Sequence, residues 1–347
     1  MEAVLCDRDA LDFWRTRSEP LIGTANPLAS LPTRRAVPDI GAPTASLLAD
    51  IKSWGLSHFE DVHLMVSSSA DRRSLKGAVY LLHSGTVPAR SFARAAGQVY
   101  VVCPELLFIQ MAQKLSLVEL LELGYELCGT YRMTRERPTY GVEPLTSVSK
   151  LKAYIQRAEG VRGRKIARCA VQWIADGSAS PAETALAIVF KLPYRKGGFG
   201  LGGFVMNPEL ELNEEAARIL GRDTIRPDLY WAEARHPAEY DSPLFHSSRE
   251  QAEYDERRRN AYDAMGMGVS IFKSRHLCSD DLMDAMAQGV RRHVGARQNR
   301  LPADYEAEHR RLLAEVFRYW RDICEQGVDR VTAEEMVARY ADPFDML

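Results

Sequence analysis

The sequence predicts an α/β protein with a short central mixed sheet flanked by helices, preceded by a small α/β domain and followed by a helical tail. Residues 180–272 show a helical pattern, a meander of strand-like runs, a second helix and an aliphatic strand, an order that favours helices packed on a sheet. Strand-like runs rich in Val, Leu and Tyr also occur between residues 62 and 103. Residues 279–342 are mostly helical in pattern.

The composition is that of a globular protein with room for two folded domains. The 347 residues are 46% hydrophobic and 27% charged, with a net charge of −2. The six cysteines are far apart and show neither a C-x-x-C pair nor the spacing of zinc ligands, which favours a reducing compartment. The first residues lack the basic start and apolar run of a secretory signal. We therefore expect a cytoplasmic protein.

Insertion into a membrane is not expected. A spanning helix needs about 20 consecutive apolar residues. The most apolar stretch, residues 99–128, is interrupted by Pro104 and by several charged side chains. It predicts a strand followed by two buried helices, the second of which opens with a capping box formed by Ser116 and Glu119.

The expected N-terminal domain covers residues 1–145, the core domain residues 146–278 and the helical extension residues 279–347. Residues 129–147 show no apolar periodicity and contain Pro138, Gly141 and Pro144, so we place a loop or domain boundary there. The elements expected before it are a helix over 44–55, strands over 62–66, 78–83 and 99–103, and helices over 104–114 and 116–127.

The core domain is expected to begin with three helices over 148–158, 163–176 and 181–191. After a Gly-rich turn, strands are expected over 204–206, 209–212, 218–220, 225–231 and 238–241. A charged helix over 248–265 and a last strand over 269–272 complete it. In the extension, one apolar stripe is formed by Leu312, Val316, Tyr319 and Ile323, and its helices are candidates for a homodimer surface or a partner site.

Three acidic residues mark a candidate site because two of them interrupt apolar strands. Asp228 lies within Arg-Pro-Asp-Leu-Tyr-Trp and Glu239 within Ala-Glu-Tyr-Asp, whereas Glu183 lies in the first turn of a helix. A hairpin turn over 232–237 would bring the two strand acids together, and a buried carboxylate requires a cation or another partner. Such an oxygen-rich corner suits Mg²⁺ or Mn²⁺, which would polarise a phosphodiester and activate water.

Two further residues extend this hypothesis. Asp241 points to the same face as Glu239 because side chains alternate along a strand, so it is a candidate third ligand or base. His246 follows five residues later and is a candidate for protonating a leaving oxygen or orienting water.

Each acid also has a structural explanation. Glu183 occupies the third position of a Ser-Pro-Ala-Glu capping box, and by spacing alone that interpretation is favoured. Asp228 is also consistent with an exposed strand residue paired with Arg226, and Glu239 and Asp241 with a solvent-facing strand surface. His246 taken alone is typical of a surface loop.

Local charge is uneven. Residues 150–196 contain ten Lys or Arg against three Asp or Glu, a local balance of +7. A basic surface beside an acidic site suits a phosphate backbone, although a solvated helix surface explains it equally well. The residues expected to contact DNA phosphates are Lys165, Arg168, Lys191, Arg195 and Lys196.

Residues 180–272 resemble the very-short-patch-repair-like endonucleases of the PD-(D/E)xK superfamily, in a bacterial protein. The likeness follows, in order, Ser180-Pro-x-Glu183, Arg226-x-Asp228-Leu-x-Trp231, Glu239-x-Asp241 with His246, Asp255 with Arg258 or Arg259, and Gly266 before Val269. Residues 36–145 are more faintly similar to AbiEi-type antitoxin regulators, through Val99-Tyr-Val-Val-Cys-Pro-Glu-Leu-Leu-Phe and the Leu-rich helix after it.

The resemblance implies a restriction-endonuclease-like core and a Mg²⁺-dependent DNA endonuclease. Glu183, Asp228 and Glu239 would hold the metal and water, and Asp241 would assist them. The superfamily's lysine is replaced here by Asp241, the subgroup's glycine by Ser242 and an aliphatic helix position by Tyr262. These departures bear on activity more than on fold.

A second class of function remains open at this stage. The same core is also consistent with a catalytically inactive scaffold in a nucleic-acid-binding, antitoxin or defence regulatory module, because a fold alone does not determine a function. A purely structural role, with Glu183 acting only as a helix cap, is the third alternative.

Overall fold

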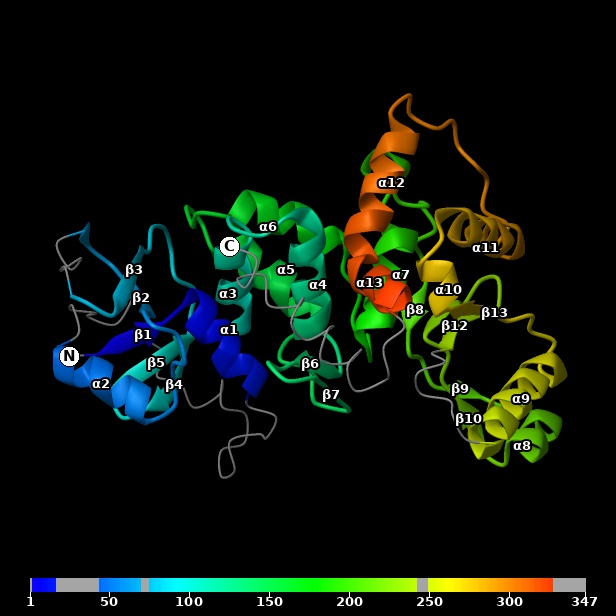
Figure 1. The fold of residues 1–347 in the computed structure, drawn as a ribbon, viewed down its shortest axis with the longest axis horizontal. Helices are drawn as coiled ribbons and strands as arrows, with labels where there is room; N and C mark the ends of the chain where they lie inside the picture. Colours follow the sequence, from blue (N-terminus) through cyan, green and yellow to red (C-terminus); the bar gives the residue numbers. More distant parts are fainter. Residues whose placement is uncertain (1, 17–43, 70–74, 242–248, 327–347) are drawn as a thin grey trace.

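The computed structural model describes residues 2–16, 44–69, 75–241 and 249–326 (Figure 1). The protein is a mixed α/β structure with mixed sheets, as expected. A five-stranded sheet forms one end of the molecule, a group of helices its middle, and a four-stranded sheet with its own helices the other end (Figure 1).

The five-stranded sheet has the strand order β3-β2-β1-β5-β4. Its strands are β1 Ala3–Leu5, β2 Val62–Val66, β3 Ala78–Leu82, β4 Phe92–Ala96 and β5 Val99–Val102. Pairs β1–β5 and β2–β3 are parallel, and β1–β2 and β4–β5 are antiparallel. The predicted strands 62–66, 78–83 and 99–103 are confirmed within one residue, whereas β1 and β4 were not predicted.

The helices beside this sheet are α1 Asp7–Thr16, α2 Ala45–Ser53, α3 Pro104–Met111 and α4 Leu117–Leu127. Every residue of α3 is buried, which explains why its sequence is apolar all round. Ser116 and Glu119 form the capping box that opens α4. The expected pair of buried helices is therefore confirmed.

The segment expected to be a loop contains a small hairpin instead, with strands β6 Tyr131–Met133 and β7 Pro138–Tyr140. Its anchor is the buried side chain of Arg132, which donates hydrogen bonds to the carbonyls of Glu126, Gly129, Tyr131 and Glu143. A single hydrophobic core continues past this hairpin from β1 to the C-terminal helices. The division at residue 145 stays a prediction.

After the hairpin come α5 Val148–Arg157, α6 Arg164–Ala170 with a 3-10 turn Val171–Trp173, and α7 Pro181–Lys191. These match the three predicted helices. A second 3-10 turn, Tyr194–Lys196, follows α7. Helix α7 is almost wholly buried because it carries the central apolar contacts between the helices in the middle of the molecule and the second sheet.

The second sheet has the strand order β13-β12-β11-β8. Its strands are β8 Val205–Met206, β11 Leu229–Trp231, β12 His236–Asp241 and β13 Ser270–Lys273. Strand β11 is antiparallel to β8 and β12, whereas β12 and β13 are parallel, so the sheet is mixed as predicted. Phe190 of α7 packs against Trp231 and Phe272, which joins the helix to the sheet.

A smaller unit extends from one edge of this sheet (Figure 1). It contains the two-stranded sheet of β9 Leu210–Glu211 and β10 Thr224–Ile225, and the helices α8 Glu214–Leu220 and α9 Arg249–Ala264. A separate hydrophobic cluster that includes Leu220, Tyr230 and Tyr262 holds it together. The predicted strand at 218–220 is wrong, because Asn213 caps α8 and Gly221 ends it in the left-handed conformation.

The C-terminal part is helical, with α10 Ser274–Leu277, α11 Asp280–His293, α12 Tyr305–Val316 and α13 Arg318–Gln326. The apolar stripe of Leu312, Val316, Tyr319 and Ile323 is buried as predicted, although it is divided between α12 and α13. A disulfide joins Cys278 to Cys324, which differs from the expectation that all six cysteines are reduced.

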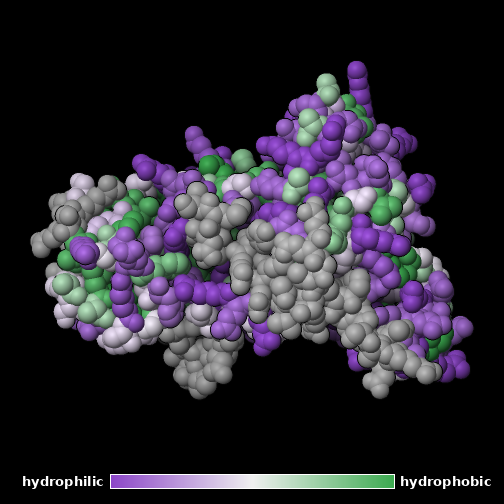
Figure 2. Space-filling view, viewed as in Figure 1, coloured by the Kyte–Doolittle hydropathy of each residue, from purple (hydrophilic) through white to green (hydrophobic). Residues whose placement is uncertain are grey.

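Hydrophilic side chains cover most of the face seen in Figure 2, with apolar residues scattered among them. In the part of the chain that the structure describes, there is no helix with the length and apolar character needed to cross a membrane.

Candidate acidic cleft

Three of the acids predicted from the sequence, Asp228, Glu239 and Asp241, line one open cleft at the second sheet, with a free volume of about 470 Å³. Residues of the β6–β7 hairpin, of β12 and β13, and of α9 line it, together with Ala179 just before α7 and Asp228 just before β11. In Figure 1, β7 and α9 lie on opposite sides of β12. The lining residues used below are Tyr140, Asn207, Arg226, Asp228, Glu239, Asp241, Tyr254, Arg258 and Arg259.

The pairing of β11 with β12 brings the two strand acids together. Leu229 pairs with Ala238 in this antiparallel register, so the preceding Asp228 lies across from Glu239. One carboxylate oxygen of Asp228 accepts a hydrogen bond from the backbone N–H of Tyr240 at 2.6 Å. The expected hairpin and the proximity of these two acids are thus confirmed.

Glu183 reaches the same place from the first turn of α7. Its backbone N–H donates to the side-chain oxygen of Ser180 at 3.2 Å, as the capping interpretation predicts. Its carboxylate, however, accepts hydrogen bonds from the backbone N–H of Ala179 at 2.9 Å and from the side-chain amide of Asn207 at 2.5 Å. With 7% of its surface exposed, Glu183 is both a buried part of the helix start and a neighbour of Asp228.

Two of the three acids, Asp228 and Glu183, lie in surroundings that disfavour their charge. Burial, followed by the negative charges of Glu183 and Glu239, raises the pKa of Asp228 well above its usual value, against the opposing effect of the Tyr240 N–H and Arg258. Burial also raises the pKa of Glu183, although hydrogen bonds from Ala179 and Asn207 oppose this. These carboxylates are therefore close enough to repel one another, which is the situation that a bound cation relieves.

Glu239 differs from the other two because it already has a cationic partner. Arg258 of α9 forms an ion pair with Glu239 and also donates to the backbone carbonyl of Arg226 at 3.1 Å. The hydroxyl of Tyr262 donates to the same carboxylate at 2.6 Å. Tyr262, which departs from the resembled pattern, therefore has a polar role here as well as a place in the second core.

These side chains fit a divalent cation only in part. Within residues 2–16, 44–69, 75–241 and 249–326, no group of three or more His, Cys, Asp or Glu side chains converges as a metal site. Two of the acids have other partners instead, since Glu239 contacts Arg258 and Glu183 contacts Asn207. The chemistry of the donors suits a hard cation, but Glu239 would have to exchange Arg258 for it.

Asp241 lines the cleft and has a partner that the sequence interpretation missed. Its carboxylate lies 3.1 Å from the ammonium of Lys273, because β12 and β13 run parallel with Asp241 opposite Lys273. Lys273 is 32 residues away along the chain, so no local motif indicated this pair. His246 lies outside the residues that the structure describes.

The five basic residues expected beside the acids do not line the cleft. Lys165 and Arg168 are exposed on α6, and Arg195 and Lys196 lie in the 3-10 turn after α7. Lys191 is at the opposite end of the 11-residue helix α7 from Glu183, a separation of roughly 12 Å along the helix axis. Its ammonium donates to the carbonyl of Ile174 at 2.7 Å, and burial lowers its pKa.

The basic residues that do line the cleft are Arg226, Arg258 and Arg259. From the sequence, all three belong to the resembled motif, and Arg226 is also a possible partner for Asp228, but none of them was predicted to contact DNA. Their role was missed because composition identifies a basic stretch of chain, whereas a cleft is lined by separate segments.

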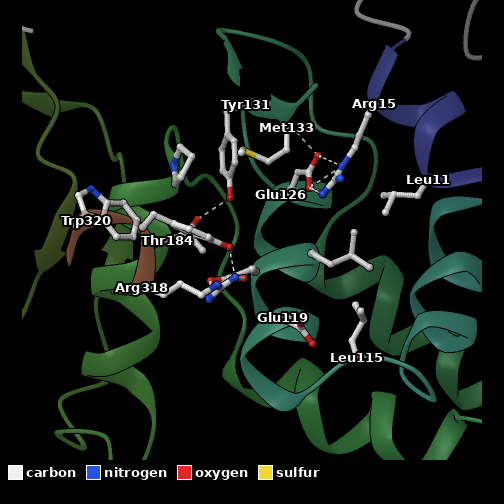
Figure 3. A pocket seen from close by; sticks show the side chains of 14 residues that line it. Leu11, Arg15, Leu115, Glu119, Glu126, Tyr131, Met133, Thr184, Arg318 and Trp320 are labelled. Carbon is white, nitrogen blue, oxygen red and sulfur yellow. Dashed lines mark hydrogen bonds and ion pairs between the residues drawn. The ribbon is translucent and has the colours of Figure 1, made fainter. Parts of the chain in front are cut away.

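A second, much smaller cavity of about 40 Å³ lies between α1, α4, α7 and α13 (Figure 3). Two of its acids are held by arginines from other helices, whereas Glu119 belongs to the capping box of α4. Glu126 accepts from Arg15 at 2.7 and 3.0 Å, and Glu122 accepts from both terminal nitrogens of Arg318 at 2.7 and 2.9 Å. A space of this size admits about one water molecule, so this site is structural.

In comparisons with known proteins, no family model, curated protein or solved structure matches the chain.

Proposed function

We propose that the protein is a metal-dependent endonuclease that hydrolyses DNA phosphodiester bonds at the acidic cleft. The observation that carries the proposal is that Asp228 and Glu239 line an open cleft from the two arms of one hairpin, with Glu183 of α7 close by, so that burial and the charges of both glutamates raise the pKa of Asp228. Perturbed carboxylates in a cleft are typical of functional sites, because an acid without a function is usually paired or exposed.

The fold around the cleft supports the same proposal. A restriction-endonuclease-like core would use the elements found here: a helix that starts beside the acids, a hairpin that bears two of them, and a parallel strand after a covering helix. We propose this relationship on the order of the elements and the acids they bear, since the sequence resemblance covers the same segment.

In this proposal Asp228, Glu183 and Glu239 would bind Mg²⁺ or Mn²⁺. Such an ion polarises a phosphodiester and activates water when bound. Arg226 and Arg259 lie on the exposed margin of the cleft, where they can bind the phosphates on either side of the scissile bond. Lys273 holds the carboxylate of Asp241 beside them.

A second function is favoured by one specific contact. Arg258 and Tyr262 already satisfy the carboxylate of Glu239, and an acid with its own arginine has no need of a metal. A catalytically inactive core that binds nucleic acid, in an antitoxin-like or defence regulatory module, would keep this arrangement permanently. It predicts salt-dependent DNA binding in EDTA and no cleavage with any metal.

One experiment separates the two. Mg²⁺ and Mn²⁺ binding is measured by calorimetry on the parent and on Asp228→Ala, and cleavage of plasmid and single-stranded DNA is followed in the same samples. The nuclease proposal expects metal binding and cleavage in the parent and neither in the variant. A parent that binds no metal and cuts no DNA would overturn it in favour of the scaffold.

The matched control is Glu233→Ala. Glu233 is an exposed acid in the turn of the same β11–β12 hairpin, at the end away from Asp228. The control should bind metal and cut DNA like the parent, which separates loss of the site from loss of one negative charge.

A further inference from the structure

Three tyrosines line the acidic cleft. Tyr240 of β12 is half-buried, with its hydroxyl 3.1 Å from that of Ser274. Tyr140 comes from β7 of the hairpin, and 43% of its surface is exposed, whereas Tyr254 comes from α9 and is half-buried. A tyrosine has an apolar ring with a polar tip, so rings that line an open cleft offer a ligand a flat face.

The ring of Tyr254 is fixed by its cationic neighbours. The guanidinium of Arg222 lies 5.6 Å from its centroid and that of Arg257 lies 5.7 Å from it. These arginines belong to the segment after α8 and to α9, so the ring is positioned before any ligand arrives. A ring that is already ordered loses little conformational entropy on binding.

The hairpin that presents Tyr140 is equally well anchored. The guanidinium of Arg132 donates hydrogen bonds to four backbone carbonyls in and beside the hairpin. The hydroxyl of Tyr131 lies 2.9 Å from that of Thr184, which follows Glu183 on α7. The aromatic side of the cleft is therefore connected to the same helix start that bears one of the acids.

Cations complete the arrangement. Arg226, Arg258 and Arg259 line the cleft together with the tyrosines and the acids, and Arg258 forms an ion pair with Glu239. Aromatic rings beside a groove of cations are the chemistry that binds unpaired nucleotides, because each base offers a flat face for stacking and each phosphate a charge. A duplex keeps its base faces stacked against one another and offers only phosphates and groove edges.

We infer that the cleft takes an unpaired DNA strand, with a base stacked on Tyr140 and the neighbouring phosphates on Arg226 and Arg259. Cleavage of such a strand rests on the proposed function, whereas its binding does not. A cleft of about 470 Å³ lies within the range of roughly 300–1,000 Å³ that small ligands and single nucleotides occupy.

The test measures binding in EDTA, so that no cleavage enters the result. Fluorescence anisotropy is followed with a fluorescein-labelled 12-nucleotide thymidine strand, with the same strand paired to its complement, and with a 12-nucleotide strand of abasic sites. The parent should bind the thymidine strand about tenfold or more tightly than the duplex. Tyr140→Ala should weaken binding of the thymidine strand by about fivefold or more, the effect of removing one stacked ring.

The abasic strand and two further variants isolate stacking. Tyr140→Ala should leave binding of the abasic strand unchanged, because that strand has phosphates but no bases. Tyr140→Phe should bind the thymidine strand like the parent, since it keeps the ring. Val79→Ala, which changes another exposed apolar side chain on β3, should have no effect on any strand.

Equal binding of strand and duplex, or an equal effect of Tyr140→Ala on the thymidine and abasic strands, would overturn the inference. Its failure is distinct from that of the nuclease proposal. A protein that binds the thymidine strand through Tyr140 and never cuts retains the inference and loses the nuclease, whereas cleavage with no effect of Tyr140→Ala does the reverse.

Discussion

Two groups of acids in this protein have opposite surroundings. Along α4, Glu122 and Glu126 each receive a two-point contact from an arginine of another helix, in a cavity of about 40 Å³ (Figure 3). At the second sheet, Asp228 and Glu239 line a cleft of about 470 Å³, and the charges of Glu239 and of the nearby Glu183 both act on Asp228. The first group joins helices together, and the second group is held in place against its own repulsion.

These surroundings distinguish structural acids from candidate functional ones. Arg15 brings α1 to α4 through Glu126, which also accepts from the backbone N–H of Met133 at 2.9 Å. Both carboxylates have a cationic partner that another helix supplies. Burial raises the pKa of Glu122, and the next largest influence, Arg318, opposes this. Burial also raises the pKa of Asp228, but there the next largest influences, Glu183 and Glu239, add to it.

The largest effect is expected at the structural acids. Arg15→Ala leaves the buried carboxylate of Glu126 without its cation, and we expect it to destabilise the protein by about 3–5 kcal/mol. Thermal unfolding followed by circular dichroism measures the change. Adding Glu126→Gln should recover part of the loss, and Arg162→Ala, at an exposed arginine, should have little effect. An Arg15→Ala variant that unfolds at the same temperature as the parent would contradict the structural role of this ion pair.

The next effect is expected on activity at the cleft. Asp228→Ala should reduce DNA cleavage about 100-fold or more, the effect of removing one group that stabilises a transition state, while unfolding changes little. Glu122→Ala should do the opposite, because its partner Arg318 then lies unpaired and the cleft is untouched. Cleavage assays and unfolding curves on both variants check this, and equal cleavage by the Asp228 variant and the parent would contradict it.

Arg258 provides a third test, since it gives Glu239 the kind of partner that the α4 acids have. If Arg258 and a metal compete for Glu239, Arg258→Ala should tighten Mn²⁺ binding by about tenfold, or about 1.4 kcal/mol. Calorimetry measures this affinity, with Arg259→Ala as the control at a neighbouring exposed arginine. Unchanged or weaker Mn²⁺ binding would show that the ion pair is structural, as on α4.

A smaller effect is expected on stability at the cleft. The raised pKa of Asp228 means that the folded state binds its proton more tightly than the unfolded state, so the parent loses stability as the pH rises through that pKa. Asp228→Asn removes the charge and should raise the melting temperature at pH 8 by on the order of 2 °C. The gain should be smaller at pH 5. A loss of stability at both pH values would remove the evidence for repulsion.

The smallest effect is a displacement of the pH profile. Metal binding requires the carboxylate form, so cleavage should increase with pH as Asp228 loses its proton. Glu183 raises the pKa of Asp228, and therefore Glu183→Gln should move the midpoint of residual metal binding or cleavage to lower pH. A midpoint that stays in place would mean that Glu183 acts only through its hydrogen bonds with Ala179 and Asn207.

Most of the elements and the pairing of two acids could be predicted from the sequence. Local signals were sufficient there, since Ser116 and Glu119 cap α4 and a turn separates the segments of β11 and β12. The turn covers 232–235 and not the predicted 232–237, because His236 and Pro237 already pair with β11. It also indicated Glu183, because a helix start is readable from Ser180 and Pro181. The strand predicted at 218–220 failed where a short apolar run was judged without its cap, Asn213.

Only the tertiary structure decided which residues share the cleft. The residues that contact the acids come from later elements, namely Arg258, Tyr262 and Lys273. Tyr140 lines the same cleft from a hairpin in a segment that has no apolar periodicity. The basic residues chosen by local density, such as Lys191, lie at the far end of α7 instead. The physical reason is that periodicity and caps are properties of neighbouring residues, whereas a cleft is lined by side chains that long-range packing brings together.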